Sequence, residues 1–429
     1  MDKLIIRGGQ RLSGKVKVSG SKNAAVAILP AVVLSQDKLT LHNLPDITDV
    51  HTMVSILEDL GVPIRRRGAN SIEFRPSMLR GYTPPYDLVK KMRASYYLMG
   101  SLLARYGRAE VPIPGGCDLG PRPIDQHLKG FAAMGANIEI ERGLISLSAN
   151  RLRGAHIYLD VVSVGATVNL MLAAVMAEGK TVLENVAKEP EIVDLANFLN
   201  AMGASIKGAG TDVIRITGVS ELGGAEHVVI PDRIEAGTFM LAAAITGGDV
   251  VIDEVIPKHL EAVLAKLREV GVDVEVEPER IRVRGMGELE PVDLKTFPYP
   301  GFPTDLQPLM MVLLTAARGT SVITENVFDG RFRHVDELKR MGARIKVEGR
   351  TAIIEGGEPL SGAPVTATDL RAGAALLLAG LAAQGETVLS DVEHIYRGYD
   401  HLEEKLAGLG GFIRRERRDH YRARSRKPV

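Results

Sequence analysis

The chain has 429 residues but only one cysteine and no tryptophan. A single thiol excludes an internal disulfide and any zinc site built from several cysteines. Aromatic residues make up only 4% of the chain, whereas proteins that bind single-stranded nucleic acid by stacking depend on aromatic rings. The ten histidines show no H-x-x-x-H spacing, so we expect neither a metal nor another cofactor.

An excess of charge and long apolar runs are also absent. The 53 Lys and Arg residues balance the 53 Asp and Glu residues, so the sequence predicts no long-range attraction to nucleic acid or to an anionic membrane. No apolar run of about 18 residues and no segment typical of a signal peptide occurs, and we expect a cytoplasmic protein. Segment 414–429, with eight Lys or Arg against two acids, is most simply a solvated end, with nucleic-acid contact as the alternative.

The chain does contain an internal repeat. A short amphipathic stretch ends in an apolar residue and a glycine, and an alternating strand follows, as in LEDLGVPIRR and LREVGVDVEVE. The phrase occurs six times at intervals of 68 to 74 residues, with its glycine at Gly61, Gly135, Gly203, Gly271, Gly342 and Gly410. Each glycine fits the left-handed position that follows a helix, and each strand alternates as a half-buried strand does.

A second phrase repeats at the same period: a helix of small apolar residues and then a β-rich strand, as in SVGATVNLMLAAVMAEGKTVLENV. These helices are apolar almost all round, so they should be buried, with the amphipathic helices outside them. Together the phrases predict an α/β fold of two similar domains, each of three βαβαββ-type repeats. We expect the first domain at residues 22–229 and the second at 1–21 plus 230–429.

The first residues of the six buried helices are unusual. They are Lys22, Arg93, Ser163, Arg233, Asp305 and Arg371. A cation at a helix N-terminus is unfavourable by a few tenths of a kcal/mol to about 1 kcal/mol, so four of them indicate a purpose other than stability. Free N–H groups and cations together bind phosphate or carboxylate, and the pattern predicts an anion site where the helix ends converge. The alternative is pairing with nearby acids such as Asp232 or Asp369.

The single cysteine, Cys117, lies in PIPGGCDLGPRPIDQHL, among glycines and prolines that favour neither helix nor strand. A lone cysteine is most often an inert buried residue. Here the composition predicts an exposed, mobile loop, and Arg122 is close enough in sequence to favour the thiolate. We therefore expect a reactive thiol.

Nine segments spread over nearly the whole chain resemble one family, the enolpyruvyl transferases. They are SGSKNAA (19–25), MRAS (92–95), GGCDLGPRPID (115–125), SVGAT (163–167), PDRIEAGTF (231–239), YPGFPTDLQ (299–307), NVFDGRFRHVDEL (326–338), DLRAGAAL (369–376) and RGYDHLEEKL (397–406). Each segment alone is weakly specific, but the set is highly specific. The family fold is the inside-out α/β barrel, two domains of three repeats with the active site between them, which the repeat count predicts independently.

The resemblance implies transfer of the enolpyruvyl group of phosphoenolpyruvate to the 3′-hydroxyl of UDP-N-acetylglucosamine, with release of phosphate. The path is addition and elimination through a tetrahedral ketal, and the product enters peptidoglycan synthesis. Cys117 matches the family's proton donor, which also forms a covalent adduct with the donor substrate and is alkylated by fosfomycin. Asp305 matches the proposed general base, with a helix N-cap as the structural alternative.

The resemblance also implies a set of residues for each role. The catalytic set is Cys117, Asp305, Lys22 and Arg397. The phosphoenolpyruvate contacts are Lys22, Asn23, Arg122, Arg371 and Arg397. The UDP-N-acetylglucosamine contacts are Asn23, Arg93, Arg122, Pro123, Ile124, Asp125, Gln126, Val164, Asp305 and Val327. Arg331 falls in a matching segment without a definite role, and Val161 stands where some relatives have lysine, which leaves open whether a nucleotide-phosphate contact is missing or replaced.

Because these residues come from both halves, we expect nucleotide-sugar binding to close the domains, with the Cys117 loop as a lid. The nearest alternative is a related enzyme that uses shikimate 3-phosphate as acceptor, which the Cys117 segment disfavours. A second is an inactive paralogue that acts as a binding scaffold. AEGKTV (177–182) is an incomplete P-loop in the wrong order, and SGSK (19–22) lacks the companion segments of a serine acylase.

Overall fold

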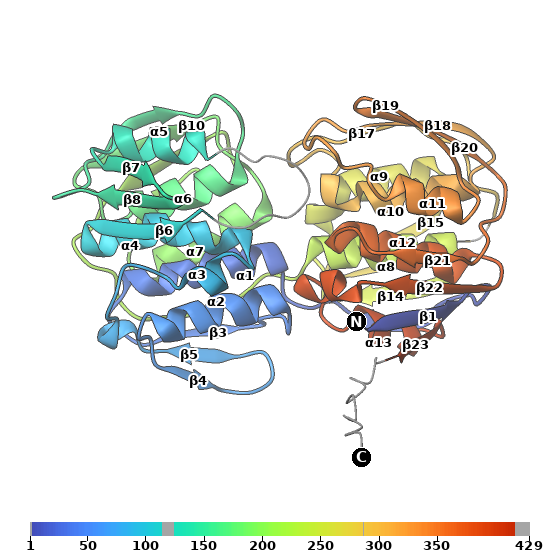
Figure 1. The fold of residues 1–429 in the computed structure, drawn as a ribbon, viewed down its shortest axis with the longest axis horizontal. Helices are drawn as coiled ribbons and strands as arrows, with labels where there is room; N and C mark the ends of the chain where they lie inside the picture. Colours follow the sequence, from blue (N-terminus) through green and yellow to red (C-terminus); the bar gives the residue numbers. More distant parts are fainter. Residues whose placement is uncertain (1, 114–123, 286, 417–429) are drawn as a thin grey trace, which may run out of the picture.

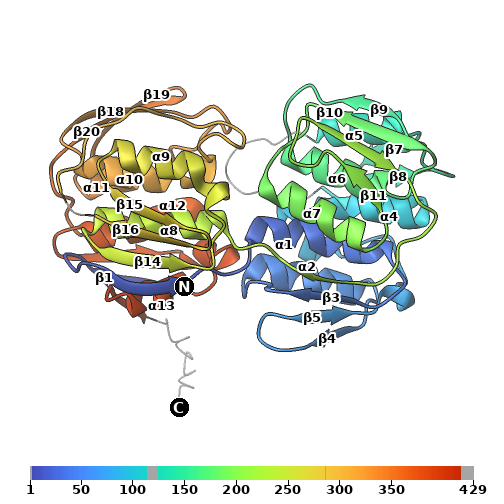
Figure 2. The ribbon, with the colours of Figure 1, turned by 180° about the vertical axis from the view of Figure 1, so that it is seen from behind.

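The chain forms two lobes that stand side by side, and a computed structural model describes residues 2–113, 124–285 and 287–416 (Figure 1). In each lobe the sheets lie largely on the outside and the most apolar helices run inside, as the view from behind also shows (Figure 2). The fold is mixed α/β with two domains, and the described strands form separate sheets rather than one closed barrel. Cys117, Arg122, Pro123 and most of segment 414–429 lie outside the described residues.

The first lobe contains three sheets. One sheet has the strand order β13 (Ala225–Val228), β3 (Leu39–His42), β5 (Ile72–Phe74) and β4 (Ile64–Arg66). The next has β6 (Arg108–Pro112), β8 (Leu144–Ser148) and β7 (Asn137–Glu141). The third has β11 (Ser205–Lys207), β12 (Val213–Thr217), β10 (Lys180–Glu184) and β9 (His156–Tyr158). Strands β13 and β9 run parallel to their neighbours, and the other pairs are antiparallel.

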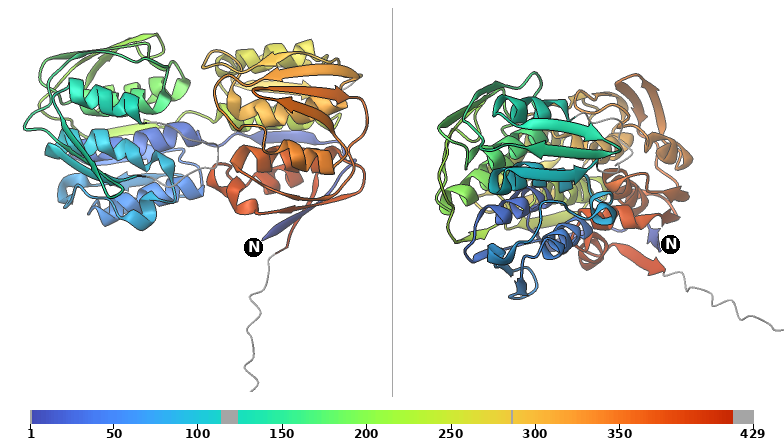
Figure 3. Two further views of the ribbon diagram at one scale, coloured as in Figure 1. Left: turned by 45° about the horizontal axis from the view of Figure 1, so that its top comes forward. Right: turned by 60° about the vertical axis from the view of Figure 1, so that its left-hand side comes forward.

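The second lobe repeats this pattern. Its sheets have the orders β15 (Asp273–Glu277), β16 (Arg280–Arg284), β14 (Asp249–Asp253), β2 (Ser13–Lys17); then β17 (Leu294–Lys295), β18 (Gly319–Thr324), β20 (Thr351–Gly356), β19 (Arg344–Glu348); and β21 (Pro364–Thr366), β22 (Glu386–Ser390), β1 (Lys3–Arg7), β23 (Phe412–Glu416). Strands β2, β17 and β21 are the parallel edge strands. The N-terminal strands β1 and β2 therefore belong to sheets of the second lobe, where β1 appears in blue among red segments (Figure 3).

The inner helices begin within one residue of the starts that the sequence predicts. They are α1 (Lys22–Ile28) continued by η1 (Leu29–Leu34), η3 (Arg93–Tyr97) leading into α4 (Leu98–Tyr106), α6 (Val164–Ala174), α8 (Arg233–Ile245), η5 (Thr304–Leu306) leading into α10 (Gln307–Ala316), and α12 (Leu370–Ala382). Nearly every residue of α6, α10 and α12 is buried, which confirms the expectation drawn from their uniform apolarity. Full burial of one leucine or valine in such a helix contributes roughly 1.5–3 kcal/mol.

The remaining helices are the amphipathic α2 (Thr48–Asp59), α5 (Asp125–Ala133), α7 (Pro190–Ala201), α9 (Glu261–Glu269), α11 (Val335–Arg340) and α13 (Leu402–Gly408), with the short α3 (Tyr86–Val89), η2 (Pro76–Met78), η4 (Pro257–Leu260) and η6 (Val392–Arg397). Helix α9 buries only Val263, Leu264 and Leu267, as an outer helix should. Helix α7 differs from the expectation, because it packs against α1 and most of its residues are buried. The six repeat glycines all have positive φ, which confirms their predicted left-handed positions.

Each lobe has its own hydrophobic core. One core runs from Ala24 to Val229. The other combines residues of segment 4–18 with residues from Ile234 to Leu409. This division supports domain boundaries at 22–229 and at 1–21 plus 230–429, which stay a prediction.

Candidate active site

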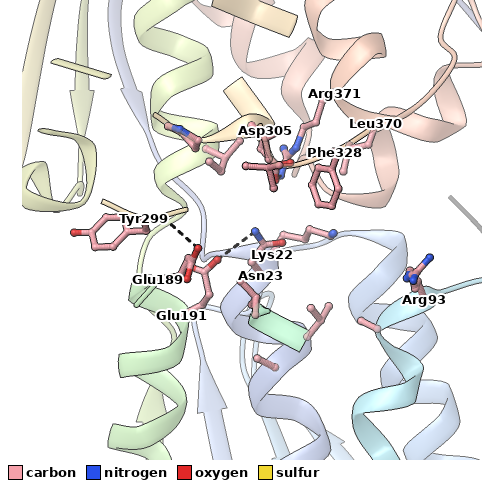
Figure 4. A pocket seen from close by; sticks show the side chains of 18 of the residues that line it. Lys22, Asn23, Arg93, Glu189, Glu191, Tyr299, Asp305, Phe328, Leu370 and Arg371 are labelled. Carbon is pink, nitrogen blue, oxygen red and sulfur yellow. Dashed lines mark hydrogen bonds and ion pairs between the residues drawn. The ribbon is translucent and has the colours of Figure 1, made fainter. Parts of the chain in front are cut away.

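The starts of the inner helices converge between the two lobes. Lys22, Arg93, Arg233, Asp305 and Arg371 line one cavity of about 280 Å³. In Figure 4, Asp305 and Arg371 of the second lobe lie across the cavity from Lys22 and Asn23 of the first. Cations of both lobes therefore gather where the helix starts converge, and the binding of an anion there stays a prediction. Ser163 does not line the cavity, but its neighbour Val164 does.

Two of these helices, α8 and α12, are capped at their N-termini by aspartates that bond to backbone N–H groups and not to the cationic side chains. Asp369 accepts N–H bonds from Arg371 and Ala372 at the start of α12 (2.8 and 3.1 Å), and Asp232 plays the same part for α8. Among the described residues, neither carboxylate forms an ion pair with a Lys or Arg side chain. Asp232 and Asp369 are therefore occupied by backbone donors, and it is other carboxylates that meet the alternative of acids paired with the cations.

Other carboxylates pair with the cations. Buried Asp49 lies 3.6 Å from Lys22 Nζ, and its Oδ1 accepts a hydrogen bond from Arg397 Nε at 3.2 Å. Lys22 and Asp49 belong to the first lobe and Arg397 to the second. One carboxylate thus holds together two cations that the resemblance assigns to the donor substrate.

A second carboxylate bridge lies beside the first. Glu191 Oε1 accepts from Asn23 Nδ2 at 3.5 Å and from Arg233 Nη2 at 3.4 Å. Its neighbour Glu189 accepts from Tyr299 N at 3.3 Å, while Glu189 Oε2 is buried without a hydrogen-bond partner among the described residues. Burial, with the nearby charge of Glu191, raises the pKa of Glu189. Figure 4 shows Glu189 and Glu191 side by side on the wall of the cavity.

Asp305 lies between two arginines. Its Oδ1 accepts from Arg331 Nη2 at 2.8 Å and its Oδ2 from Arg371 Nη2 at 3.1 Å. Burial by itself would raise the pKa of Asp305, but Arg371 and Arg331 outweigh it and hold this pKa well below its usual range. Asp305 is therefore ionised at neutral pH, and Arg331, which the sequence left without a role, is its second partner.

Asp305 does not cap a helix. It is the second residue of η5, whose N-cap is Pro303, and Leu306 precedes α10. The N-cap alternative for this residue is wrong. Its carboxylate points at arginines rather than at backbone N–H groups.

The residues predicted to bind the nucleotide are only partly brought together. Arg93, Val164 and Val327 line the cavity, whereas Ile124, Asp125 and Gln126 are not among its lining residues. The Gln126 side chain is buried and bonded to Asp125 and Asp160, at 2.7 and 3.1 Å, so its amide serves to hold Asp160. Val161 is exposed beside that residue.

Sequence reasoning missed Asp49, Glu189 and Glu191 as members of the site. Asp49 and Glu191 lie in the first turns of α2 and α7. Acids also occupy the first turn of the repeat-equivalent helices α5, α9, α11 and α13. An acid there is favourable for any helix, so alignment of the repeats would have found these positions without separating the two that face the cavity.

Two absences hold for the part of the chain that the structure describes. No group of three or more His, Cys, Asp or Glu side chains there is arranged to hold a metal ion. No helix in those residues has the length and apolarity needed to cross a membrane.

Comparison with known proteins identifies the class. The family model described as EPSP synthase (3-phosphoshikimate 1-carboxyvinyltransferase) matches residues 6–406. The chain belongs to this family of enolpyruvyl transferases.

Two relatives are similar to this chain over nearly its whole length. The chain is 58% identical over 417 residues to UDP-N-acetylglucosamine 1-carboxyvinyltransferase 3 of Caldanaerobacter subterraneus subsp. tengcongensis, covering 97% of this chain and 100% of the relative. It is 56% identical over 418 residues to UDP-N-acetylglucosamine 1-carboxyvinyltransferase 2 of Bacillus subtilis, covering 97% of each chain.

Solved structures agree on the fold. The enolpyruvyl transferase NikO from Streptomyces tendae superposes with a TM-score of 0.88 at 29% identity, covering 96% of this chain and 98% of that one. EPSP synthase from Acinetobacter baumannii gives 0.74 at 21% identity, covering 97% and 100%, which bears on the fold alone.

Proposed function

We propose that the chain transfers the enolpyruvyl group of phosphoenolpyruvate to the 3′-hydroxyl of UDP-N-acetylglucosamine and releases phosphate. One observation carries the proposal: Lys22 of the first lobe and Arg371 and Arg397 of the second line one cavity. The donor is a small molecule with a phosphate and a carboxylate, and several fixed cations suit such a charge. The shared name of the relatives at 56–58% identity supports the acceptor.

The reaction has two balanced steps. In the addition, the methylene carbon of the donor gains a proton, while the sugar hydroxyl loses one and bonds to C2. In the elimination, C2 loses phosphate and the new methyl group loses a proton, which restores the double bond. The resemblance assigns the first proton to Cys117, which lies outside the described residues together with Arg122 and Pro123.

Asp305 is the group that we propose takes the hydroxyl proton. Arg331 and Arg371 lower its pKa, so in the free protein it is ionised but weakly basic. An anionic donor bound to Arg371 adds negative charge close to Asp305 and offsets the effect of Arg371, which raises the pKa of Asp305. The basicity of Asp305 then rises when the donor is present, which is when the proton has to move.

The remaining proposed contacts are those with the nucleotide and with the sugar. We propose that Arg93, Val164 and Val327, with Ile124 to Gln126, hold the nucleotide, and that Asn23 contacts the sugar. Closure of domains 22–229 and 1–21 plus 230–429 would bring the two substrates together, and the cytoplasm, where nucleotide sugars are made, is the proposed location. The second candidate acceptor is shikimate 3-phosphate, because the matching family model carries that enzyme's description.

Phosphate release tests the proposal. The wild-type protein with phosphoenolpyruvate should release phosphate with UDP-N-acetylglucosamine and not with shikimate 3-phosphate. Asp305→Ala should lower kcat by roughly 10²- to 10⁴-fold, the usual contribution of a general base. Asp336→Asn, on an exposed carboxylate of α11, is the matched control and should match wild type. Release with shikimate 3-phosphate alone would select the second candidate, and full activity of Asp305→Ala would refute the role of Asp305.

A further inference from the structure

Two short segments connect the lobes, and they run side by side. Segment 18–22 leaves β2 in the second lobe and enters α1 in the first, while segment 229–233 leaves β13 in the first lobe and enters α8 in the second. Their backbones pair through Gly20 with Pro231 in an antiparallel bridge, Ser21 N–H with Ile230 O (2.7 Å) and Asp232 N–H with Ser19 O (2.9 Å). The two crossings thus form a two-stranded joint.

The joint is packed tightly against the first lobe. A Cβ atom on Gly20 would lie 1.7 Å from the carbonyl oxygen of Asn43, so only glycine fits there. The Asn43 side chain in turn donates to Val229 O at 2.8 Å. Both crossings are therefore fixed to the same residue of the first lobe.

One carboxylate connects the two helices that leave the joint. Asp232 Oδ1 accepts the N–H groups of Ile234 and Glu235 in the first turn of α8, at 2.7 and 3.0 Å. Asp232 Oδ2 accepts the N–H group of Lys22, the first residue of α1, at 2.8 Å. Asp232 is only 4% exposed. It therefore caps one helix from each lobe at once.

The capped helix starts are those that carry cations into the cavity. Lys22 reaches Asp49, and Arg233 reaches Glu191 across the lobes. Because Asp232 bonds to main-chain N–H groups, it sets the position of the Lys22 Cα relative to α8 without using the side chains of Lys22 and Arg233. We propose that Asp232 is a positioning residue, which keeps Lys22 in register with the cations of the second lobe. The inference rests on the proposed function for its kinetic consequence, but not for its geometry.

The two substrates should depend on this joint differently. The donor contacts come from both lobes, with Lys22 on one side and Arg371 and Arg397 on the other. The UDP-N-acetylglucosamine contacts, such as Arg93 and Val164, lie in the first lobe apart from Val327 and Asp305. A change in register between the lobes therefore affects donor binding far more than nucleotide binding.

Asp232→Asn tests this. Asparagine has one acceptor oxygen, which keeps the two bonds to α8, and its NH₂ group then meets the Lys22 N–H, so only the link between lobes is lost. Loss of a charge-assisted hydrogen bond should lower kcat/KM for phosphoenolpyruvate by about tenfold or more. The KM for UDP-N-acetylglucosamine should stay within about threefold, and the Lys22 amide should exchange hydrogen faster.

Asp194→Asn is the matched control. Asp194 is also buried and also accepts a linker N–H, from Ile230 at 3.2 Å, but it lies in α7 of the same lobe. Asp194→Asn should leave kcat/KM for phosphoenolpyruvate and the hydrogen-exchange rate of the Lys22 amide as in wild type. The inference would be overturned if Asp232→Asn lowered kcat/KM equally for phosphoenolpyruvate and for UDP-N-acetylglucosamine, or if it left the hydrogen-exchange rate of the Lys22 amide unchanged. If wild type releases no phosphate, the proposed function fails, and the exchange comparison still decides the joint.

Discussion

Gln307, the first residue of α10, is fully buried, yet neither its amide nitrogen nor its amide oxygen has a hydrogen-bond partner among the described residues. Each such unsatisfied group costs roughly 1–3 kcal/mol. The rest of the helix is apolar apart from Thr315, and Asp305 lies two residues before Gln307. Gln307 therefore weakens the fold at a position where its helical neighbours are buried and apolar.

Gln307→Met, which keeps the length of the side chain and removes its polar atoms, should therefore raise stability. One kcal/mol corresponds to roughly 2–4 °C in the melting temperature of a domain of this size, and calorimetry would measure it. Gln126→Met is the comparison, because the Gln126 amide is bonded to Asp125 and Asp160, and this change should lower the melting temperature. An unchanged or lower value for Gln307→Met would show that this amide is satisfied in solution.

Single residues also show how far the sequence could lead. Lys22 and Arg371 were predictable, because a cation at a helix start is unfavourable and therefore conspicuous. Asp49 and Glu191 were not, because an acid in a first turn is ordinary. Their importance comes from Arg397 and Arg233, which are far away in sequence and meet them only after folding.

At the scale of elements, the strand after each repeat glycine lies at the edge of its sheet: β4, β7, β11, β15, β19 and β23. The alternating pattern predicted these strands, and its charged positions also protect them from pairing with the edge strand of another molecule. On β19, exposed Lys346 and Glu348 flank Val347 and pair with each other at 2.6 Å. Charged side chains on an edge oppose pairing with another edge.

Lys346→Val combined with Glu348→Val should therefore make the protein self-associate. The variant presents four apolar positions in a row, 345–348, and its sedimentation coefficient should rise with concentration. Loss of the exposed ion pair itself should change the stability little, because solvent screens the two charges. The same charges removed from α11, by Asp336→Val with Lys339→Val, should leave sedimentation as in wild type. Equal behaviour of both double variants would contradict the edge argument.

Element-level prediction succeeded where six copies repeat one pattern and failed where one copy departs from it. The six helix starts and the six glycine positions recur, so errors in one copy are corrected by the others. Helix α7 has the pattern of an outer helix, but it is buried because α1 and the cavity lie against it. No local pattern records such a neighbour.

At the scale of the whole molecule, the two cores differ in their buried titratable groups. His127 lies in the first lobe and His334 in the second, and burial lowers the pKa of each to about 4. Between pH 6.5 and about 4, the unfolded chain binds a proton at each position and the folded chain does not. Stability is therefore lost as pH falls, by up to about 3 kcal/mol for each histidine.

The second lobe also holds a group with the opposite dependence. Burial raises the pKa of Glu235 to about 7, although Lys405 at 2.5 Å opposes the shift. Between pH 4.5 and about 7 the folded chain binds a proton there that the unfolded chain does not, so stability grows as pH falls. Glu235 thus offsets His334 in the second lobe, and Glu189, whose pKa burial also raises, acts in the opposite direction to His127 in the first lobe.

His127 should make the first lobe more sensitive to acid when the pH is lowered from 7 to 5. Hydrogen exchange followed by mass spectrometry in increasing urea, corrected for the intrinsic rate, resolves the two cores. His127→Asn keeps an acceptor near the bond from Asn169, which is 2.9 Å long in the wild type, and it removes the titrating ring, so the acid sensitivity of the first lobe should decrease. His156→Asn, at an exposed histidine of the same lobe, should retain it. Equal acid sensitivity of the first lobe in wild type and in His127→Asn would contradict this role of His127.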